Sequence, residues 1–383
     1  MTNWDIEYLK LCKKILKEGV EVENRTGINA VKIPSYSFEF DTKKEFPILE
    51  SKQMFYRQAI IEMLWIWQMG SNNVKDLQDR NVHIWDEWMI DEDGIYRIYE
   101  PVTENYDENK EVVVLDPLSV PISNPDGKLQ PKKAENGNIL KAKSLIPGKN
   151  IRMAKYYGKE YKNTIGTAYG FIVNRYSHTK NLIETLKNNK NDRRMVKSLW
   201  QDEFLRTAVL PSCVWSTEWD VTNDTLNLSV HQRSCDVPLG LPFNVTQYAT
   251  LLNMIAKETN LEPGKIFYSI KNPHIYVNQL DGIKEQLERE VRYNSLKNCS
   301  KEELIKLKNI FEKAMEHKEK DSDEYRKFDT DRRTIDIVLD PKTPKLELDD
   351  VESFFDYDNS KDLKNVRVKD YKHMGKIKFP LAQ

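Results

Sequence analysis

The sequence predicts an α+β protein built around a mixed sheet rather than a doubly wound parallel one. Predicted strands and helices interleave along the 383 residues, but without the regular spacing of β–α–β units. Hydrophobic residues make up 39% of the chain and charged residues 31%, which is typical of a globular protein with a large core. We therefore expect a single domain over residues 1–383, with insertions.

The elements of the first half follow from the spacing of apolar residues. Residues 4–18 carry apolar side chains at helical intervals and predict an amphipathic helix. Residues 30–40 partly alternate between apolar and polar side chains, which indicates a strand. Residues 56–69 are apolar on most sides and predict a buried helix, in which the carboxylate of Glu62 must be hydrogen-bonded or functional. A short helix should begin within 181–187.

The second half predicts a similar mixture of strands and helices. The runs 206–219 and 225–231 have the composition of paired strands. The segment 241–259 follows a turn that is rich in Pro and Gly, and it predicts a helix. Residues 266–270 predict another strand, and residues 274–289 another helix.

Two segments differ from the rest in composition. Residues 92–163 are rich in Asn, Lys, Asp, Pro and Gly and contain only short apolar runs, so we expect an insertion that could hold a hairpin of its own. A second insertion is expected at 296–345, where residues 296–330 hold a highly charged helical segment. A solvated surface helix is the simplest interpretation of that charge pattern.

Charge and cysteine content bear on the class of protein. Lys plus Arg number 59 and Asp plus Glu number 60, so no basic field points to nucleic acid as a required partner. The four cysteines have no CxxC spacing, and we expect neither a disulfide framework nor a metal site. The N-terminus has no apolar signal region and no stretch approaches 18 apolar residues, so the sequence predicts no membrane association and a cytoplasmic location, the host cytoplasm if the chain is viral.

Cys213 is the candidate nucleophile. A lone cysteine is more often a small core residue, but this one precedes the run QRSCDVPLGLPFN at 232–244. An arginine near a thiol favours the thiolate, which is the attacking form, and Arg233 and Ser234 could also bind an anion such as phosphate.

That run resembles the signature of the thymidylate synthase family, and six further motifs resemble that family in the same order. They span nearly the whole chain apart from the two expected insertions. The six motifs are Glu23-Asn24-Arg25-Thr26-Gly27, Glu62-Met63-Leu64-Trp65, Trp85-Asp86-Glu87-Trp88, Tyr169-Gly170-Phe171, Asp192-Arg193-Arg194 and His274-Ile275-Tyr276.

The resemblance implies a fold, a reaction and a co-substrate. The fold would be the family's mixed sheet with surrounding helices, paired through the sheet face in a homodimer. Cys213 would add to C6 of dUMP, and C5 would then attack the methylene carbon of 5,10-methylenetetrahydrofolate. Hydride transfer would complete the reaction and give dTMP and dihydrofolate. Neither a metal nor a flavin is implied.

The resemblance also assigns the nucleotide contacts. Arg25, Arg233 and Ser234 would hold the 5′-phosphate together with Arg193 and Arg194 of the partner subunit, because planar guanidinium groups suit phosphate.

The sugar and the base have their own predicted contacts. His274 and Tyr276 would bind the sugar hydroxyl, although both residues could instead be packing residues at the start of a helix. Asn244 would read uracil, because its amide offers both a donor and an acceptor, whereas the corresponding hydroxymethylase of dCMP carries Asp. Taken alone, Asn244 could simply be a helix cap.

The remaining site residues act on the reaction or on folate. Glu62 would anchor a water network for proton transfer, and Tyr169 would help to remove the C5 proton. The folate pocket would be built from tryptophan walls, a carboxylate for the pterin ring that also adjoins the substrate, and a lysine near the folate tail. These residues are Trp85, Trp88, Asp236 and Lys52.

The sequence departs from the family pattern at three places, which keeps alternatives open. Val214 stands where the family usually has histidine, the Tyr-Gly motif continues differently after Phe171, and the chain ends in Ala382-Gln383. A wetter site would let water replace hydride, which would make the enzyme a dUMP hydroxymethylase. An inactive nucleotide- or RNA-binding paralogue is a third hypothesis, against which the joint presence of Cys213 and Asn244 argues.

Overall fold

A five-stranded mixed sheet forms the centre of the computed structural model, which describes residues 1–24, 26–100, 106–320 and 322–381. The pair β11–β13 is parallel, and the other neighbours in this sheet are antiparallel. Its strands, in spatial order, are β3 (Ser35–Asp41), β13 (Glu262–Lys271), β11 (Thr225–Gln232), β10 (Val214–Thr222) and β9 (Val196–Ser198). The expected α+β class with a mixed sheet is confirmed.

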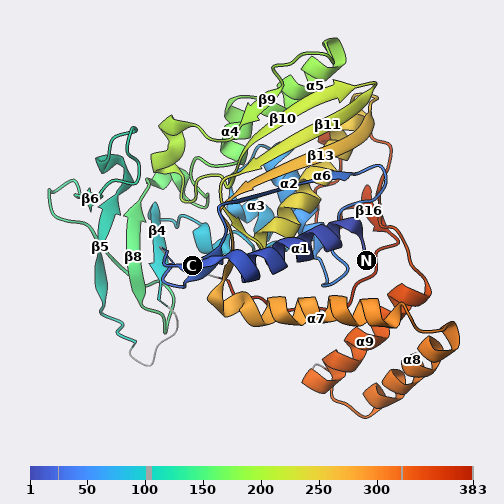
Figure 1. Cartoon of the computed structure of the whole chain (residues 1–383). Helices are drawn as coiled ribbons and strands as arrows, with labels where there is room; N and C mark the ends of the chain where they lie inside the picture. Colours follow the sequence, from blue (N-terminus) through green and yellow to red (C-terminus); the bar gives the residue numbers. More distant parts are fainter. Residues whose placement is uncertain (25, 101–105, 321, 382–383) are drawn as a thin grey trace.

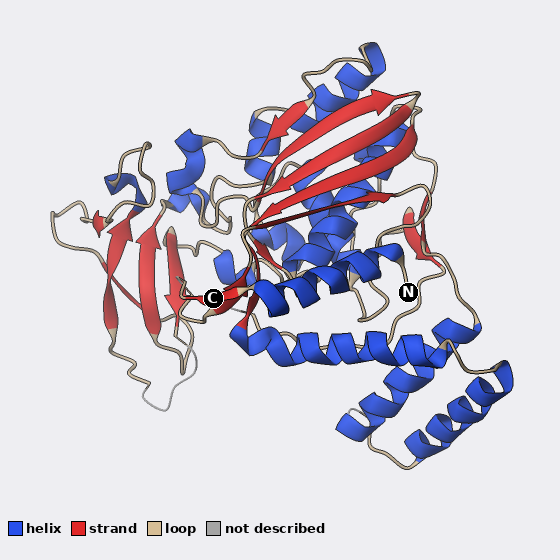
Figure 2. Ribbon diagram, in the orientation of Figure 1, coloured by secondary structure: helices blue, strands red, loops and turns tan. Residues whose placement is uncertain are grey.

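One face of this sheet is covered by helices. Alternate residues of β11, among them Leu228 and Val230, are fully buried, as expected for a strand with one covered face. Figure 1 shows α2 (Tyr56–Trp67) and α6 (Gly240–Glu258) behind the sheet. The opposite face carries the exposed ring of Phe267, and no helix among the described residues lies over it (Figure 2).

Helix α1 (Asn3–Glu18) begins where the sequence predicts a helix. The hydroxyl of Thr2 accepts from the N–H of Asp5 at 3.1 Å and caps the first turn. Its buried face, with Trp4 and Tyr8, packs into the main core beside β3.

The predicted strand 30–40 is divided in two by Ile33 and Pro34. Its first part, β2 (Ala30–Lys32), leaves the central sheet and joins a small second sheet with β1 (Val20–Val22), β14 (Pro273–Tyr276) and β12 (Cys235–Asp236). This four-stranded sheet, in the order β1-β2-β14-β12, carries residues from two of the sequence motifs, and the first arginine motif lies in the loop between β1 and β2.

Two boundaries predicted near the site are wrong. His274 and Tyr276 lie on β14, and helix α7 (Leu280–Leu296) begins only after them, because β14 pairs with β2 and β12. The predicted strand from 206 begins only at Val214, the first residue of β10. The preceding residues form the 3-10 helix η4 (Asp202–Thr207) and a loop that contains Pro211, which has no N–H for a sheet ladder.

The smaller helices complete the main body. Helices α3 (Val74–Gln78) and α4 (Gly170–Arg175) are short, and α5 (His178–Asn188) begins three residues before the predicted helix start. A hairpin of β15 (Lys345–Leu348) and β16 (Val366–Lys369) packs against the main core.

The 92–163 segment folds around a small core of its own. Its described part contains five short strands: β4 (Ile95–Tyr99), β5 (Glu111–Asp116), β6 (Gln130–Pro131), β7 (Lys141–Lys143) and β8 (Ile151–Tyr156). Ile95, Val114, Ala142, Ile151 and Ala154 are buried together, separately from the main core. Figure 1 shows this segment projecting from the side of the central sheet.

The charged 296–330 region forms two helices rather than one. Helix α8 (Lys301–Glu316) begins at a capping box of Ser300 and Glu303, and α9 (Asp323–Leu339) begins at the cap Ser322. The second cap starts a new helix, because its hydroxyl accepts from the N–H of Tyr325 at 3.2 Å. In the part of the chain that the structure describes, no helix is long and apolar enough to cross a membrane.

Candidate active site

A cleft of about 560 Å³ opens between the small sheet, the loop before β10 and the 92–163 segment. It is lined by five residues that the sequence analysis assigned to the nucleotide: Cys213, Arg233, Ser234, His274 and Tyr276. These residues come from distant parts of the chain. The parallel pairing of β12 with β14 brings the 233–236 and 274–276 motifs side by side.

Cys213 is held through its main chain. Its carbonyl oxygen accepts from the N–H of Arg233 at 2.9 Å. Its own N–H donates to the hydroxyl of Tyr169 at 2.8 Å. The half-buried thiol therefore lines the cleft from a fixed backbone.

Arg233 is positioned by carbonyls and by a ring. Its Nε donates to the carbonyl oxygen of Ser212 at 3.1 Å, and one Nη donates to that of Pro211 at 2.7 Å. The guanidinium carbon lies 5.2 Å from the centre of the Trp200 ring. These contacts hold the positive charge of Arg233 against the loop that leads to Cys213.

Asn272 connects the two motifs of the small sheet. Its Nδ2 donates to Oγ of Ser234 at 3.1 Å. Nδ1 of His274 lies 2.9 Å from the carbonyl oxygen of Asn272, and because a carbonyl only accepts, Nδ1 is the donor. The His274 and Tyr276 rings meet edge to face at 5.0 Å.

The loop that contains the first arginine motif also borders the cleft. Arg25 itself lies outside the described residues. Oδ1 of Asn24 accepts from the N–H and the hydroxyl of Thr26 at 2.9 and 2.7 Å, and Nδ2 donates to the carbonyl of Ile28 at 2.7 Å. Asn24 thus shapes the loop, which is a role that the sequence analysis missed.

Glu62 lies behind the cleft in a buried hydrogen-bonded network. Its two carboxylate oxygens accept from Nε1 of Trp85 at 2.7 Å and from Nε2 of Gln247 at 2.5 Å. Burial raises the pKa of Glu62 to about 7, although these two hydrogen bonds act in the opposite direction. A carboxyl group with such a pKa can take up and release a proton near neutral pH.

The same network orients the amide of Asn244. Its Nδ2 donates to Oε1 of Gln247 at 3.1 Å, and its Oδ1 accepts from Nε2 of Gln232 at 3.2 Å. Gln232 is in turn fixed by the hydroxyl of Tyr268, which donates to its Oε1 at 2.6 Å. Asn244 is the fifth residue of α6, and its side chain makes no N-terminal capping hydrogen bond.

Tyr169 has an unusual backbone conformation. Its φ is +47° and its ψ −105°, a conformation that is costly for a residue with a side chain. The next residue must be glycine, because a Cβ on Gly170 would lie 1.8 Å from the carbonyl oxygen of Ser71. Burial, and secondarily the nearby Cys213, raises the pKa of Tyr169 well above its ordinary value. In this conformation the hydroxyl of Tyr169 accepts from the N–H of Cys213.

The residues assigned to folate form a second group. The rings of Trp85 and Trp88 meet edge to face at 5.5 Å, and Trp85 lies 5.5 Å from the Tyr169 ring. Asp236 is half-buried, its Oδ2 accepts from Nε2 of Gln279 at 3.1 Å, and desolvation raises its pKa. Trp85 and Tyr169 therefore connect this group to Cys213.

Lys52 belongs to the same group and meets the C-terminal segment. Its ammonium donates to the carbonyl oxygen of Pro238 and lies 4.6 Å from the centre of the Phe379 ring. Burial lowers its pKa to about 8. Gln279 also donates to the carbonyl oxygen of Pro380 at 3.1 Å. The segment before the chain end is thus packed against the folate-assigned residues.

Arg193 and Arg194 lie away from the cleft of their own chain. Arg194 is highly exposed and forms a bidentate contact with Asp192 at 2.8 and 3.0 Å. Arg193 lines a hollow of about 710 Å³ on the open side of the central sheet, which also includes Phe267. Within one chain, these two arginines therefore do not reach Cys213.

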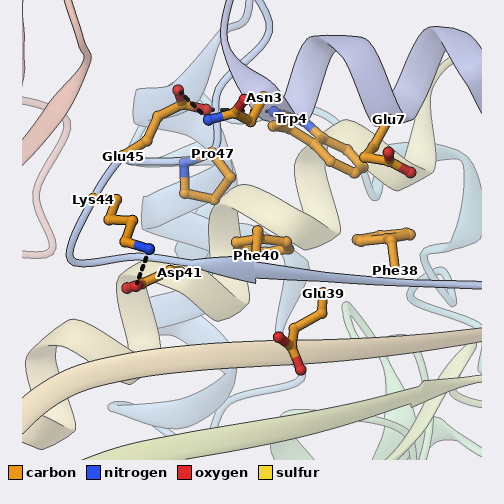
Figure 3. Close-up of a pocket in the computed structure, with 10 residues that line it drawn as sticks. All are labelled: Asn3, Trp4, Glu7, Phe38, Glu39, Phe40, Asp41, Lys44, Glu45 and Pro47. Carbon is orange, nitrogen blue, oxygen red and sulfur yellow. Dashed lines mark hydrogen bonds and ion pairs between the residues drawn. The ribbon is translucent and has the colours of Figure 1, made fainter.

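A further hollow of about 210 Å³ lies between α1 and β3, and Figure 3 shows its lining. Its floor is aromatic, with ring centres of Trp4 and Phe38 4.9 Å apart and those of Phe38 and Phe40 6.0 Å apart. None of its lining residues was assigned to the site from sequence. This hollow lies where a helix packs on the edge strand of the sheet.

The residues that the sequence analysis missed are mainly amides. Gln232 and Gln247 are both buried and complete the hydrogen bonds of Asn244 and Glu62. One signal could have found Gln247, since it follows Asn244 by three residues and so shares its face of the helix. Gln232 opens the run at 232–244, but its contact with Tyr268 could not be read from the sequence, because the two residues are distant in the chain.

Comparison with known proteins supports the family resemblance. Residues 6–321 match the family model described as thymidylate synthase. The chain is 37% identical over 289 residues to the thymidylate synthase of Clostridium beijerinckii, which covers 76% of this chain and 83% of that protein. It is 32% identical over 283 residues to the thymidylate synthase of Mycoplasma mobile, covering 74% and 85% of the two chains.

A solved structure is similar along the whole chain. It is the thermostable thymidylate synthase A from Bacillus subtilis, with a TM-score of 0.63, 25% identity and 100% coverage of both chains. Together with the site geometry, these similarities show that the chain belongs to the thymidylate synthase family.

Proposed function

We propose that this enzyme transfers one carbon from 5,10-methylenetetrahydrofolate to C5 of dUMP through a covalent bond between Cys213 and C6. The products would be dTMP and dihydrofolate. The observation that carries the proposal is the position of Cys213, which shares one cleft with Arg233 and whose N–H donates to the hydroxyl of Tyr169.

The chain supplies the groups that each step needs. Cys213 adds to C6 as a thiolate, and this addition makes C5 a carbon nucleophile. C5 then bonds to the methylene carbon of folate, after which the C5 proton must leave. We assign the transfer of this proton to the hydroxyl of Tyr169 and the carboxyl group of Glu62. Trp85 contacts both residues.

Recognition of uracil falls to Asn244. Gln232 donates to its Oδ1 and Gln247 accepts from its Nδ2, so the amide has only one orientation that satisfies both neighbours. The remaining lone pair and the remaining N–H match N3–H and O4 of uracil. Cytosine presents the reverse pattern, which favours dUMP over dCMP.

The residues present suit folate as the co-substrate. The half-buried Trp88 and the buried Trp85 offer aromatic walls, and the carboxyl group of Asp236 can accept from a pterin N–H. Lys52, whose charge interacts with Asp236, would supply a cation for the carboxylates of the folate tail.

We also propose a homodimer formed through the open face of the central sheet. This would bring Arg193 and Arg194 of the partner subunit to the phosphate, because they lie on that side and away from their own cleft. Mixing inactive Cys213→Ala protein with inactive Arg193→Ala/Arg194→Ala protein should restore activity, since one complete site forms in the mixed dimer. If activity does not recover although subunits exchange, the arginines act within their own chain.

The 92–163 and 296–345 segments would be insertions into a single domain. Each has a local core beyond the main one, the first around Val114 and the second around Leu304 and Ile335.

Two experiments test the proposed function. Incubation with dUMP and methylenetetrahydrofolate, followed by mass analysis of the nucleotide, should give dTMP together with dihydrofolate. Hydroxymethyl-dUMP with tetrahydrofolate would show that water replaces hydride, as in a dUMP hydroxymethylase.

Fluoro-dUMP with the same folate should label Cys213 covalently. Cys213→Ala should abolish the adduct and the turnover, whereas Cys299→Ala, at a half-buried thiol between α7 and α8, should retain both. If the wild-type protein forms no adduct, the chain is an inactive nucleotide- or RNA-binding relative.

A further inference from the structure

The 92–163 segment contributes one wall of the nucleotide cleft. Pro117, Pro125, Leu129 and Lys155 line the cleft together with Cys213 and Arg233. The wall is therefore made by a part of the chain that carries none of the sequence motifs of the site.

Arg206, on η4, joins this wall to the body of the enzyme. One Nη of Arg206 donates to the carbonyl oxygen of Val120 at 2.9 Å, and it also lies 3.4 Å from that of Leu118. Both carbonyls belong to the 92–163 segment. The guanidinium also lines the cleft.

The backbone that carries Arg206 is rigid. Oγ1 of Thr167 donates to the carbonyl oxygen of Phe204 at 2.8 Å, and the N–H of Thr167 donates to that of Thr207 at 3.1 Å. The Phe204 ring also packs edge to face on Phe171, with ring centres 5.1 Å apart. Arg206 is thus held from both sides, so a ligand would find it already in position.

Two buried polar atoms on the cleft are unsatisfied. Within the described ranges, Nε of Arg206 and Oδ1 of Asn272 are buried without a hydrogen-bond partner. Buried polar groups are normally paired, and an exception often marks a place that a ligand or water completes. The two differ in kind, since Nε can donate to an oxyanion and Oδ1 can accept from a hydroxyl group.

The charge of the cleft favours an anion. Its described lining includes the cations Lys32, Lys155, Arg206 and Arg233, but only the anions Glu23 and Asp126. One Nη of Arg206 donates to main-chain carbonyl oxygens, and Nε and the other Nη can still donate to one phosphate group.

We propose that Arg206, held by the carbonyls of Leu118 and Val120, binds the 5′-phosphate of the nucleotide substrate. The 92–163 segment would then act as a specificity element that positions a phosphate ligand from within the same chain. This inference rests on the proposed function, because it adds a residue to the same nucleotide site.

The experiment compares dUMP with deoxyuridine, which lacks the phosphate. Arg206→Ala should raise the Kd and KM of dUMP about tenfold, the usual result of losing a charge-assisted hydrogen bond, with little change in kcat. The inhibition constant of deoxyuridine for the Arg206→Ala variant should equal that for the wild-type protein. Arg152→Ala, an exposed arginine of the same segment outside the cleft, should leave all these constants unchanged.

Three outcomes would overturn the inference. The first is that Arg206→Ala leaves the affinity for dUMP unchanged. The second is that it weakens the binding of dUMP and of deoxyuridine equally, as loss of a purely structural contact would. The third is that it weakens only the binding of folate, by an amount that depends on the number of glutamates in the folate tail. Arg206→Lys, which keeps the charge, repeats the comparison if the alanine variant does not fold, and it should lose less dUMP affinity. Failure of wild-type protein to form the fluoro-dUMP adduct would instead count against the proposed function.

Discussion

The side-chain amide of Gln247 donates to Oε2 of Glu62 at 2.5 Å and joins α6 to α2 inside the core. Through its Oε1, the same amide accepts from Asn244, the residue that we assign to the base. One buried glutamine therefore connects Asn244, which we propose reads uracil, with Glu62, which we propose takes part in proton transfer.

Replacement of Gln247 by Leu should disturb both groups at once. Because the hydrogen bond from Gln247 lowers the pKa of Glu62, its loss should raise that pKa further and shift the acid limb of the kcat/KM profile to higher pH. We expect kcat to fall on the order of tenfold. Asn253→Ala, on the same helix but outside the network, is the matched control. An acid limb at the wild-type position would contradict the assignment of that limb to Glu62.

Replacement of Glu62 by Gln should change the pH dependence of stability. Burial raises the pKa of Glu62 from 4.5 to about 7, so between these values the folded protein holds a proton that the unfolded chain releases. The free energy of unfolding contributed by this group therefore falls as pH rises from 4.5 to 7, by on the order of 3 kcal/mol. Urea denaturation of the wild-type and Glu62→Gln proteins from pH 4.5 to 8 measures the difference between their free energies of unfolding. The contributions of the other titrating groups cancel in this difference. A constant difference across this range would disprove the raised pKa.

Replacement of Asn244 by Asp should alter the choice of base. A carboxylate cannot donate to Gln247, but its oxygen can accept from the amino group of cytosine. The kcat/KM for dUMP should fall roughly a hundredfold, and the ratio of dCMP to dUMP turnover should rise. Asn298→Asp, at an exposed residue that follows α7, serves as the control. An unchanged ratio would remove the argument that Asn244 reads the base.

Replacement of Tyr169 by Phe should separate adduct formation from turnover. The hydroxyl is assigned to removal of the C5 proton, and fluoro-dUMP carries fluorine in place of that proton. The variant should therefore still form the covalent adduct with fluoro-dUMP while kcat for dUMP falls about a hundredfold. Release of tritium from dUMP labelled at C5 would measure removal of the C5 proton directly. If the adduct is lost in parallel with turnover, Tyr169 serves mainly to hold the backbone of Cys213.

The main helices and the class of fold could be predicted because their signals are local. The apolar face of α1, the all-round apolar pattern of α2 and the long α6 are each visible in consecutive residues. The boundaries near the cleft could not be predicted in the same way. His274 lies on a strand because β2 and β12 pair with it, and both are distant in sequence.

The sequence by itself determined the family and pointed to Cys213 as the candidate nucleophile, because order and identity of motifs are properties of the chain. Only the tertiary structure decided which groups meet. It placed Gln247 between Glu62 and Asn244, left Arg194 away from its own cleft, and brought Arg206 to the 92–163 segment. Hydrogen bonds and burial depend on neighbours in space, and long-range strand pairing sets those neighbours.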